Sequence, residues 1–164
     1  MEINRDELAH FLKIKESYER IGAGVTDATV AGNPKTTEQQ YIHERVASTK
    51  LNGYAPSMAY TANVYSDDPV NEFLYDLGRT FKNGKSCQTT LCNVELWTDP
   101  TGKACKAVEW NVEITVDNPG SGASGGLLNS SGTIYYRGNP VEGTFDTSTK
   151  KFTCLLYTSD AADD

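Results

Sequence analysis

The alternation of apolar and polar positions is clearest in residues 108–117. Val108, Trp110, Val112, Ile114 and Val116 alternate with Glu109, Asn111, Glu113, Thr115 and Asp117. A period of two places successive side chains on opposite faces of a strand, so this segment predicts a half-buried strand with a polar face. Trp110 lies in the apolar register, which indicates a core residue.

Weaker alternation and turn signals predict the strands around it. Residues 91–98 alternate and are followed by Asp-Pro-Thr-Gly, which favours a hairpin with residues 104–117. Further strands are expected at 17–22, 39–48, 57–66 and 130–138. The Gly-, Thr- and Asn-rich residues 22–37 indicate a loop, Asn52-Gly53 a turn, and residues 119–126 a flexible connector.

One helix is predicted, at residues 69–82. Asp68 can cap its first turn, and Pro69 suits the first helical position because it lacks an N–H that would have no partner. Asn83-Gly84 favours its end. Val70, Phe73, Leu74, Leu77 and Phe81 form one apolar stripe, so these side chains are expected to pack on the core.

The order of strands, one helix and more strands predicts an α+β chain that is mainly antiparallel β. We expect a sheet or sandwich whose one face is closed by the helix. Residues 1–153 have the length of a single domain. Residues 1–16 mix charged and apolar positions, which leaves a short helix and an arm as alternatives.

The last residues, "CLLYTSDAADD", break from the pattern before them and resemble the translated read-through of a sequencing adapter. Residues 154–164 are therefore expected to be non-native. Without Asp160, Asp163 and Asp164, the formal net charge of −7 becomes −4. A mildly acidic chain without a Lys/Arg cluster disfavours tight DNA binding. The absence of a long apolar run or signal-peptide pattern predicts a soluble, cytoplasmically made protein without a membrane span.

No motif for catalysis, cofactor binding or metal binding is found. Cys87, Cys92 and Cys105 offer three ligands without suitably spaced histidines, so buried thiols are expected rather than zinc. Gly22-x-Gly24 lacks the third glycine of a dinucleotide loop. Neither of the two histidines lies in a nucleophile motif. An enzyme is therefore disfavoured, and no cofactor is expected.

The stretch "YYRGNPVEGTFD", residues 135–146, poses one more choice between a phosphate loop and a turn. A phosphate loop needs backbone N–H groups that open a helix, and Pro140 removes one. The residues after it continue as a strand. Gly138-Asn139-Pro140 is therefore predicted to turn the chain between two strands.

Six stretches, taken together, resemble the major tail tube proteins of long-tailed bacteriophages that infect Gram-positive hosts. They are "SYERIGAGVTD", "NPKTTEQQYIHE", "LNGYAPS", "DPVNEFLYDLGR", "VEITVDN" and "LLNSSGTIYYRGNPVEGTFDTSTKKFT", in family order. The glycine-rich "DNPGSGASGGLL" departs in detail from the loop that is usual in the family.

The resemblance implies a β-sandwich-like or barrel-like fold with one flanking helix, similar also to the tube protein of type VI secretion machines. It implies hexameric rings that stack into a tube, through which double-stranded DNA passes without specific binding. Implied partners are other copies of the chain, the tape measure, the tail tip and the terminator protein. Implied localisation is the virion, after assembly in the host cytoplasm.

Residue roles follow from combining the pattern with the resemblance. The polar row Glu109, Asn111, Glu113 and Thr115 is a candidate for the channel face, where acidic side chains would repel DNA. The turn-rich segments supply candidates for ring stacking: Thr26, Asn33, Pro34, Asn52, Tyr54 and Pro56.

Alternative functions remain open at the level of sequence. A tail terminator or a secretion-tube subunit would share the fold and differ in how far it polymerises. A carbohydrate-binding β-sandwich would use Tyr135, Tyr136, Trp97 and Trp110 as a stacking platform.

Overall fold

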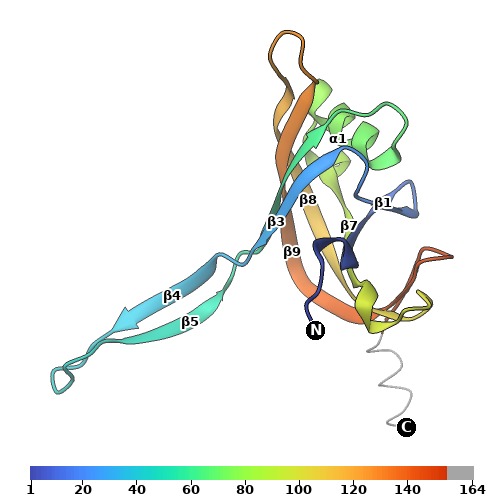
Figure 1. Cartoon of the computed structure of the whole chain (residues 1–164). Helices are drawn as coiled ribbons and strands as arrows, with labels where there is room; N and C mark the ends of the chain where they lie inside the picture. Colours follow the sequence, from blue (N-terminus) through green and yellow to red (C-terminus); the bar gives the residue numbers. More distant parts are fainter. Residues whose placement is uncertain (155–164) are drawn as a thin grey trace.

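The computed structural model describes residues 1–154, which form an eight-stranded antiparallel sheet, a separate two-stranded ribbon and one α-helix (Figure 1). The strands are β1 Leu8–Ile14, β2 Ser17–Arg20, β3 Val25–Ala31, β4 Pro34–Gln39, β5 Ser48–Tyr54, β6 Ser57–Asn63, β7 Gln88–Glu95, β8 Cys105–Ser121, β9 Asn129–Asp146 and β10 Lys151–Cys154. The helix is α1, Pro69–Arg79, and short 3-10 turns occupy Arg5–Glu7, Gly84–Cys87 and Leu96–Thr98.

The large sheet has the strand order β2-β1-β7-β8-β9-β6-β3, with β10 also paired to β9, and the small sheet pairs β4 with β5. Every pairing is antiparallel. The predicted class, mainly antiparallel β with one flanking helix, is confirmed.

The predicted turn at Gly138-Asn139-Pro140 is wrong, because β9 runs through it. Glu109 of β8 pairs with Val141, whereas Asn111 pairs with Arg137, so the three residues form a bulge opposite Trp110. Gly138 has φ 69°, a conformation that glycine adopts at little cost. The bulge bends the strand without ending it. Strand β8 likewise extends to Ser121, so the connector comprises residues 122–128 and not the predicted 119–126.

The helix begins as predicted. The side chain of Asp68 accepts a hydrogen bond from the backbone N–H of Asn71 at 3.0 Å, and Pro69 is the first helical residue. Val70, Leu74 and Leu77 are buried in a cluster with apolar residues of β8, β9, β6, β7 and β1, and Phe73 is half-buried against it. The helix therefore covers one face of the sheet.

Phe81 does not join this packing, so that part of the predicted stripe is wrong. The helix ends at Arg79, and Phe81 follows it with φ 52° and 76% of its surface exposed. The helix thus ends before Phe81, whose ring stays mostly exposed beside the cavity between the end of α1 and β8.

A second core lies on the opposite face of the sheet, where β8 begins. It consists of Ala9, Phe11, Tyr18, Cys92, Val94, Cys105, Ala107 and Phe145. The Phe145 ring lies 4.4 Å from that of Phe11 and 5.7 Å from that of Tyr18, centroid to centroid. Strand β1, with four consecutive buried residues, is covered on both faces, whereas the start of β8 is buried on this face only and leaves Lys106 exposed on the other. Cys87, Cys92 and Cys105 are buried free thiols, as expected.

The first third of the chain differs most from the sequence prediction. Residues 8–14 form β1 within the large sheet, so neither a helix nor a free arm describes residues 1–16 as a whole. The predicted loop at 22–37 holds β3 and most of β4, and the predicted strand at 39–48 is mainly the loop 40–47 between β4 and β5. Asn52-Gly53 lies inside β5, beside a bulge, and not in a turn.

The predicted boundary of the non-native tail falls at the edge of the described residues. Cys154 ends β10, where it pairs with Gly143 of β9. Residues 155–164 lie outside the described part of the chain.

A buried histidine joins strands β1, β7 and β9 on the helix side of the sheet. His10 is 3% exposed, and its Nδ1 lies 2.6 Å from Oδ1 of Asn93. The Asn93 amide donates to the Tyr136 hydroxyl, and the guanidinium of Arg5 lies 3.0 Å from His10 Nε2. These partners fit a neutral ring with its proton on Nδ1, and burial lowers the pKa of His10.

The packing of α1 generates a prediction for stability. Leu74→Ala should lower the free energy of unfolding by about 2–5 kcal/mol, because it leaves a cavity between the helix and the sheet. Phe81→Ala should change it by about 0.5 kcal/mol or less, because the ring is exposed. Urea unfolding of both variants measures this, and equal losses would contradict the placement of Phe81.

The buried histidine generates a prediction for pH dependence. The folded-state pKa of His10 is lower than the unfolded value of about 6.5. The neutral ring therefore makes its full contribution to the free energy of unfolding above that pH. Stability should fall as the pH drops below about 6.5, by at most about 1.4 kcal/mol per pH unit from this group. Urea unfolding from pH 7.5 to 5.5 should show a shallower decline for His10→Gln. An equally steep decline in that variant would exclude His10 as the cause.

Candidate assembly surfaces

One half of the sheet has a solvent-facing polar surface on the side away from α1, which we call the open face. It begins on β8 where the second core ends, and it spans five strands by register. Among its members are Gln88 and Thr90 of β7, Asn111, Glu113 and Thr115 of β8, Thr133, Tyr135 and Arg137 of β9, Ala59 and Thr61 of β6, and Asp27 and Thr29 of β3. Most of these side chains are exposed.

The open face carries neutral hydroxyl and amide groups with few charges. Glu113 Oε1 accepts a hydrogen bond from the Gln88 amide at 2.9 Å. Thr115 donates its hydroxyl proton to the carbonyl of Thr133 at 3.3 Å. Arg137, opposite Asn111 in the register, adds a positive charge to the same face. With Asp27 and Glu113 on the same face, these three charges sum to −1, so the surface is polar and only weakly acidic.

Of the four residues predicted for a channel face, three lie on the open face and one does not. Asn111, Glu113 and Thr115 are there, whereas Glu109 sits at the edge of the second core. The Tyr18 hydroxyl donates to Glu109 Oε2. Burial, with the carboxylate beside it, raises the pKa of Tyr18, so the hydroxyl keeps its proton. Glu109 therefore has a structural partner within the subunit.

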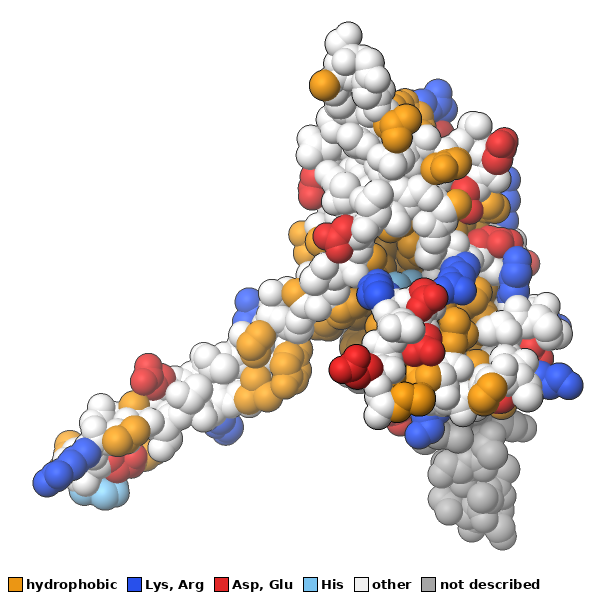
Figure 2. Space-filling model, viewed as in Figure 1, with side chains coloured by type: hydrophobic (Ala, Val, Ile, Leu, Met, Phe, Trp, Pro, Cys, Tyr) orange, Lys and Arg blue, Asp and Glu red, His pale blue; other side chains and the backbone are white. Residues whose placement is uncertain are grey.

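Strands β4 and β5, with the loop 40–47, form a ribbon that projects from the body and that we call the arm (Figure 1). Nearly every residue of both strands is exposed. Its exposed large apolar side chains are Tyr41, Ile42, Val46, Leu51 and Tyr54. Figure 2 shows hydrophobic side chains along the arm, gathered most densely near its base. A lone two-stranded ribbon is only marginally stable in water, so a partner surface is expected to cover it.

The residues predicted for ring stacking fall mostly on the arm. Pro34, Asn52 and Tyr54 belong to its strands, and Asn33 and Pro56 lie where it joins the body. Thr26 does not: it lies in β3, where its hydroxyl donates to the carbonyl of Thr61 at 3.2 Å.

Sequence reasoning missed the apolar residues of the arm's tip loop. Tyr41, Ile42 and Val46 were assigned to a strand from their spacing, and Ile42 is 107% exposed. One signal could have indicated an exposed loop. Charged and polar residues lie on both sides of this short apolar group, and such residues are rarely buried in a core strand.

Strands β2 and β3 are the two ends of the large sheet's strand order. Within residues 1–154, β3 pairs only with β6, so one edge of this seven-residue strand has no strand beside it. Unpaired edges offer backbone N–H and C=O groups to another chain. The two edges are therefore candidate surfaces for side-by-side association.

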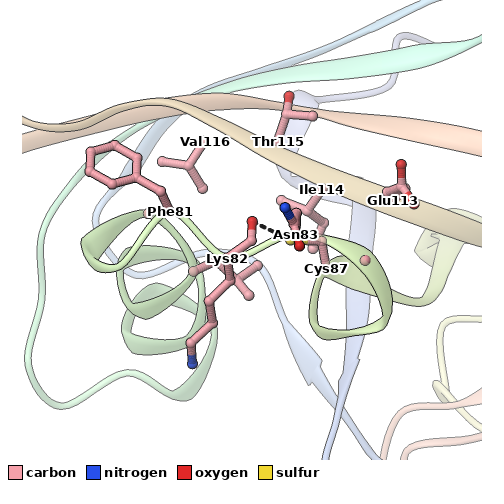
Figure 3. Close-up of a pocket in the computed structure, with 11 residues that line it drawn as sticks. Phe81, Lys82, Asn83, Cys87, Glu113, Ile114, Thr115 and Val116 are labelled. Atoms are coloured by element: carbon pink, nitrogen blue, oxygen red, sulfur yellow. Dashed lines mark hydrogen bonds between the residues drawn. The ribbon is translucent and has the colours of Figure 1, made fainter.

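A cavity of about 260 Å³ lies between the end of α1 and β8 (Figure 3). Leu77, Phe81, Cys87 and Val116 are among its lining residues, and the Cys87 thiol donates to the carbonyl of Lys82 at 3.1 Å. Burial raises the pKa of Cys87, which keeps the thiol protonated and unlike an activated nucleophile. Lys82, Asn83 and Glu113 also line the cavity, which is therefore a gap of mixed character beside the end of the helix.

The aromatic residues considered for sugar binding do not share one surface. The rings of Trp110 and Tyr136 lie 4.9 Å apart on the helix side, whereas Tyr135 points to the open face. In residues 1–154, no group of three or more His, Cys, Asp or Glu side chains is arranged to hold a metal ion. No helix in the described part of the chain is long and apolar enough to cross a membrane.

Comparison with known proteins gives a match at the level of structure. No family model and no curated protein matches the sequence. A chain from the tail of an empty GTA particle, determined with helical refinement and C6 symmetry, superposes with a TM-score of 0.60 at 16% identity. A chain from the virion of a native gene transfer agent (GTA) particle superposes with a TM-score of 0.55 at 15% sequence identity. In both cases the match covers 93% of this chain and all of the other. The chain thus has the fold of a protein found in the tail of a GTA particle.

Proposed function

We propose that this chain is a tail tube subunit, which forms hexameric rings that stack into the tube of a phage-like particle. The observation that carries the proposal is the fold shared over 93% of the chain with a protein from a C6-symmetric tail. The arm, the unpaired sheet edges and the open polar face each have a use in such an assembly.

Side-by-side contacts within a ring use the edges of the large sheet. A head-to-tail ring of subunits brings one edge of each sheet toward the opposite edge of its neighbour, and closure leaves no edge free. In such a ring one face of each sheet lines the channel. We assign the open face to the channel, which places α1 and the core beneath it on the outside. Hydroxyl and amide groups predominate along this wall, and the charges of Asp27, Glu113 and Arg137 sum to −1 per subunit, which gives DNA phosphates little to bind.

Stacking between rings uses the arm. Ile42 and Val46 at its tip gain about 1.5–3 kcal/mol each when a neighbouring ring covers them. Lys35, Arg45 and Lys50 outnumber Glu38 and Glu44 on residues 34–54, so the arm carries a net charge of +1 on an acidic chain. Opposite charge on the body of the next subunit favours its approach.

The finer assignments follow from the sequence resemblance. They are a siphovirus-type phage of a Gram-positive host, assembly in the host cytoplasm, and contacts with tape measure, tail tip and terminator proteins. DNA passing through the lumen without specific binding is part of the same proposal. No cofactor and no catalysis are needed for this function.

Assembly of the full-length chain tests the proposal. Concentrated protein should form hollow tubes or stacked rings in negative-stain electron microscopy. Ile42→Asp should lower tube yield at least tenfold, because about 1.5–3 kcal/mol is lost at each of six subunits per ring junction. Phe81→Asp is the matched control, an exposed apolar side chain off the arm.

Each outcome of this experiment separates the alternatives. Single rings that never stack would favour a tail terminator and contradict the tube. Wild-type tube yield from Ile42→Asp would exclude the arm tip as a stacking contact. A glycan array that captures the monomer would favour the carbohydrate-binding module.

The orientation of the sheet generates a second prediction. Thr115→Lys adds a ring of positive charge to the open face, whereas Thr80→Lys adds the same charge beside the end of α1. Both variants should form tubes, and only Thr115→Lys tubes should protect a short DNA duplex from nuclease, because the bound DNA lies inside. Protection by Thr80→Lys tubes alone would show that the helix side lines the channel.

A further inference from the structure

The direction of the arm depends on a joint of four residues. Strand β3 ends at Ala31 and β4 begins at Pro34, so the chain leaves the body through residues 32–33. Strand β5 ends at Tyr54 and β6 begins at Ser57, so it returns through residues 55–56. The arm's strands pair only with each other among the described residues, and no sheet ladder continues across the joint.

Asn33 bridges the two crossings. Its φ is 48°, in the left-handed region that asparagine tolerates better than most residues. Its amide nitrogen donates to the carbonyl oxygen of Ala55 at 3.1 Å and to the hydroxyl oxygen of Ser57 at 3.3 Å. One side chain thus ties the outgoing crossing to the returning one.

The returning crossing is in turn fixed to the body. The backbone N–H of Tyr136 in β9 donates to the carbonyl of Pro56 at 3.1 Å. The N–H of Ala55 donates to the carbonyls of Gly32 and Asn33 at 3.1 and 3.2 Å. A Cβ on Gly32 would lie 3.3 Å from a ring carbon of Tyr54, which shows that the ring packs closely over the joint.

We infer that Asn33 is a positioning residue that aims the arm before another ring arrives. The inference rests on the proposed stacking function and adds a residue whose role is to fix a direction rather than to touch the partner. An arm that already points to its docking surface loses less conformational entropy when it binds. If the arm moved freely, the apparent affinity between rings would fall in proportion to the fraction of time that the arm points in the right direction.

The variant Asn33→Asp isolates the amide donors. Aspartate has nearly the same size and also tolerates a left-handed backbone, but it cannot donate to the Ala55 carbonyl. The matched control is Asn52→Asp, because the Asn52 amide donates to the Thr37 hydroxyl within the arm. Ser57→Ala removes only one acceptor from Asn33 and should have a smaller effect.

The arm's direction is measured by electron spin resonance distances on dilute, full-length protein. One label is attached through Lys50→Cys on the arm and one through Lys106→Cys on the body, both exposed, in a Cys154→Ser background. The wild type should give one narrow distribution. Asn33→Asp should widen it about twofold or more, whereas Asn52→Asp leaves it narrow. Thermal unfolding of the body should not change in either variant.

Assembly provides the second readout. If the loosened arm points correctly about one tenth of the time, the critical concentration for tubes rises about tenfold in Asn33→Asp. It should stay at the wild-type value in Asn52→Asp. A narrow distribution in Asn33→Asp, or a broad one already in the wild type, overturns the inference about Asn33.

The two proposals fail in distinguishable ways. If the wild type forms no tubes, the proposed function fails, while the distances in the dilute protein still decide whether Asn33 fixes the joint. If tubes form and Asn33→Asp behaves as wild type in both readouts, only the role of Asn33 fails.

Discussion

The antiparallel ladder between β8 and β9 is the interaction on which the rest of the structure depends. These two strands, of 17 and 18 residues, lie at the centre of the large sheet. β7, β1 and β2 extend the sheet from β8, and β6 and β3 extend it from β9. The helix packs on Val112 and Ile114 of the same ladder. Loss of its register would therefore move the core, the open face and the base of the arm together.

The ladder also separates two environments along its length. Near Cys105 the face away from α1 is buried in the second core, which gives this half apolar area to fold stably. Beyond Asn111 one face stays with the helix and the other is left to solvent. An exposed polar face, two unpaired edges and an unsupported arm are costly features for an isolated protein. All three become useful when identical copies surround the subunit.

The sequence predicted the elements whose own pattern is complete. Strand β8 alternates without a break from Val108 to Thr115, and α1 has a cap, a first-turn proline and an apolar stripe. The arm could not be found in this way, because an exposed ribbon has no buried face to create alternation. Gly138-Asn139-Pro140 has turn chemistry, and only its pairing with β8 makes it a bulge. Likewise, the contact of Glu109 with Tyr18 spans 91 positions and leaves no local signal.

A cryo-electron microscopy reconstruction of the assembled protein tests the central claim most directly. Six subunits per ring are expected, with Asn111 and Thr115 facing the channel, α1 outside, and Ile42 buried against the adjacent ring. A channel lined by α1, or an arm that stays in solvent between unconnected rings, would contradict the proposed use of these surfaces.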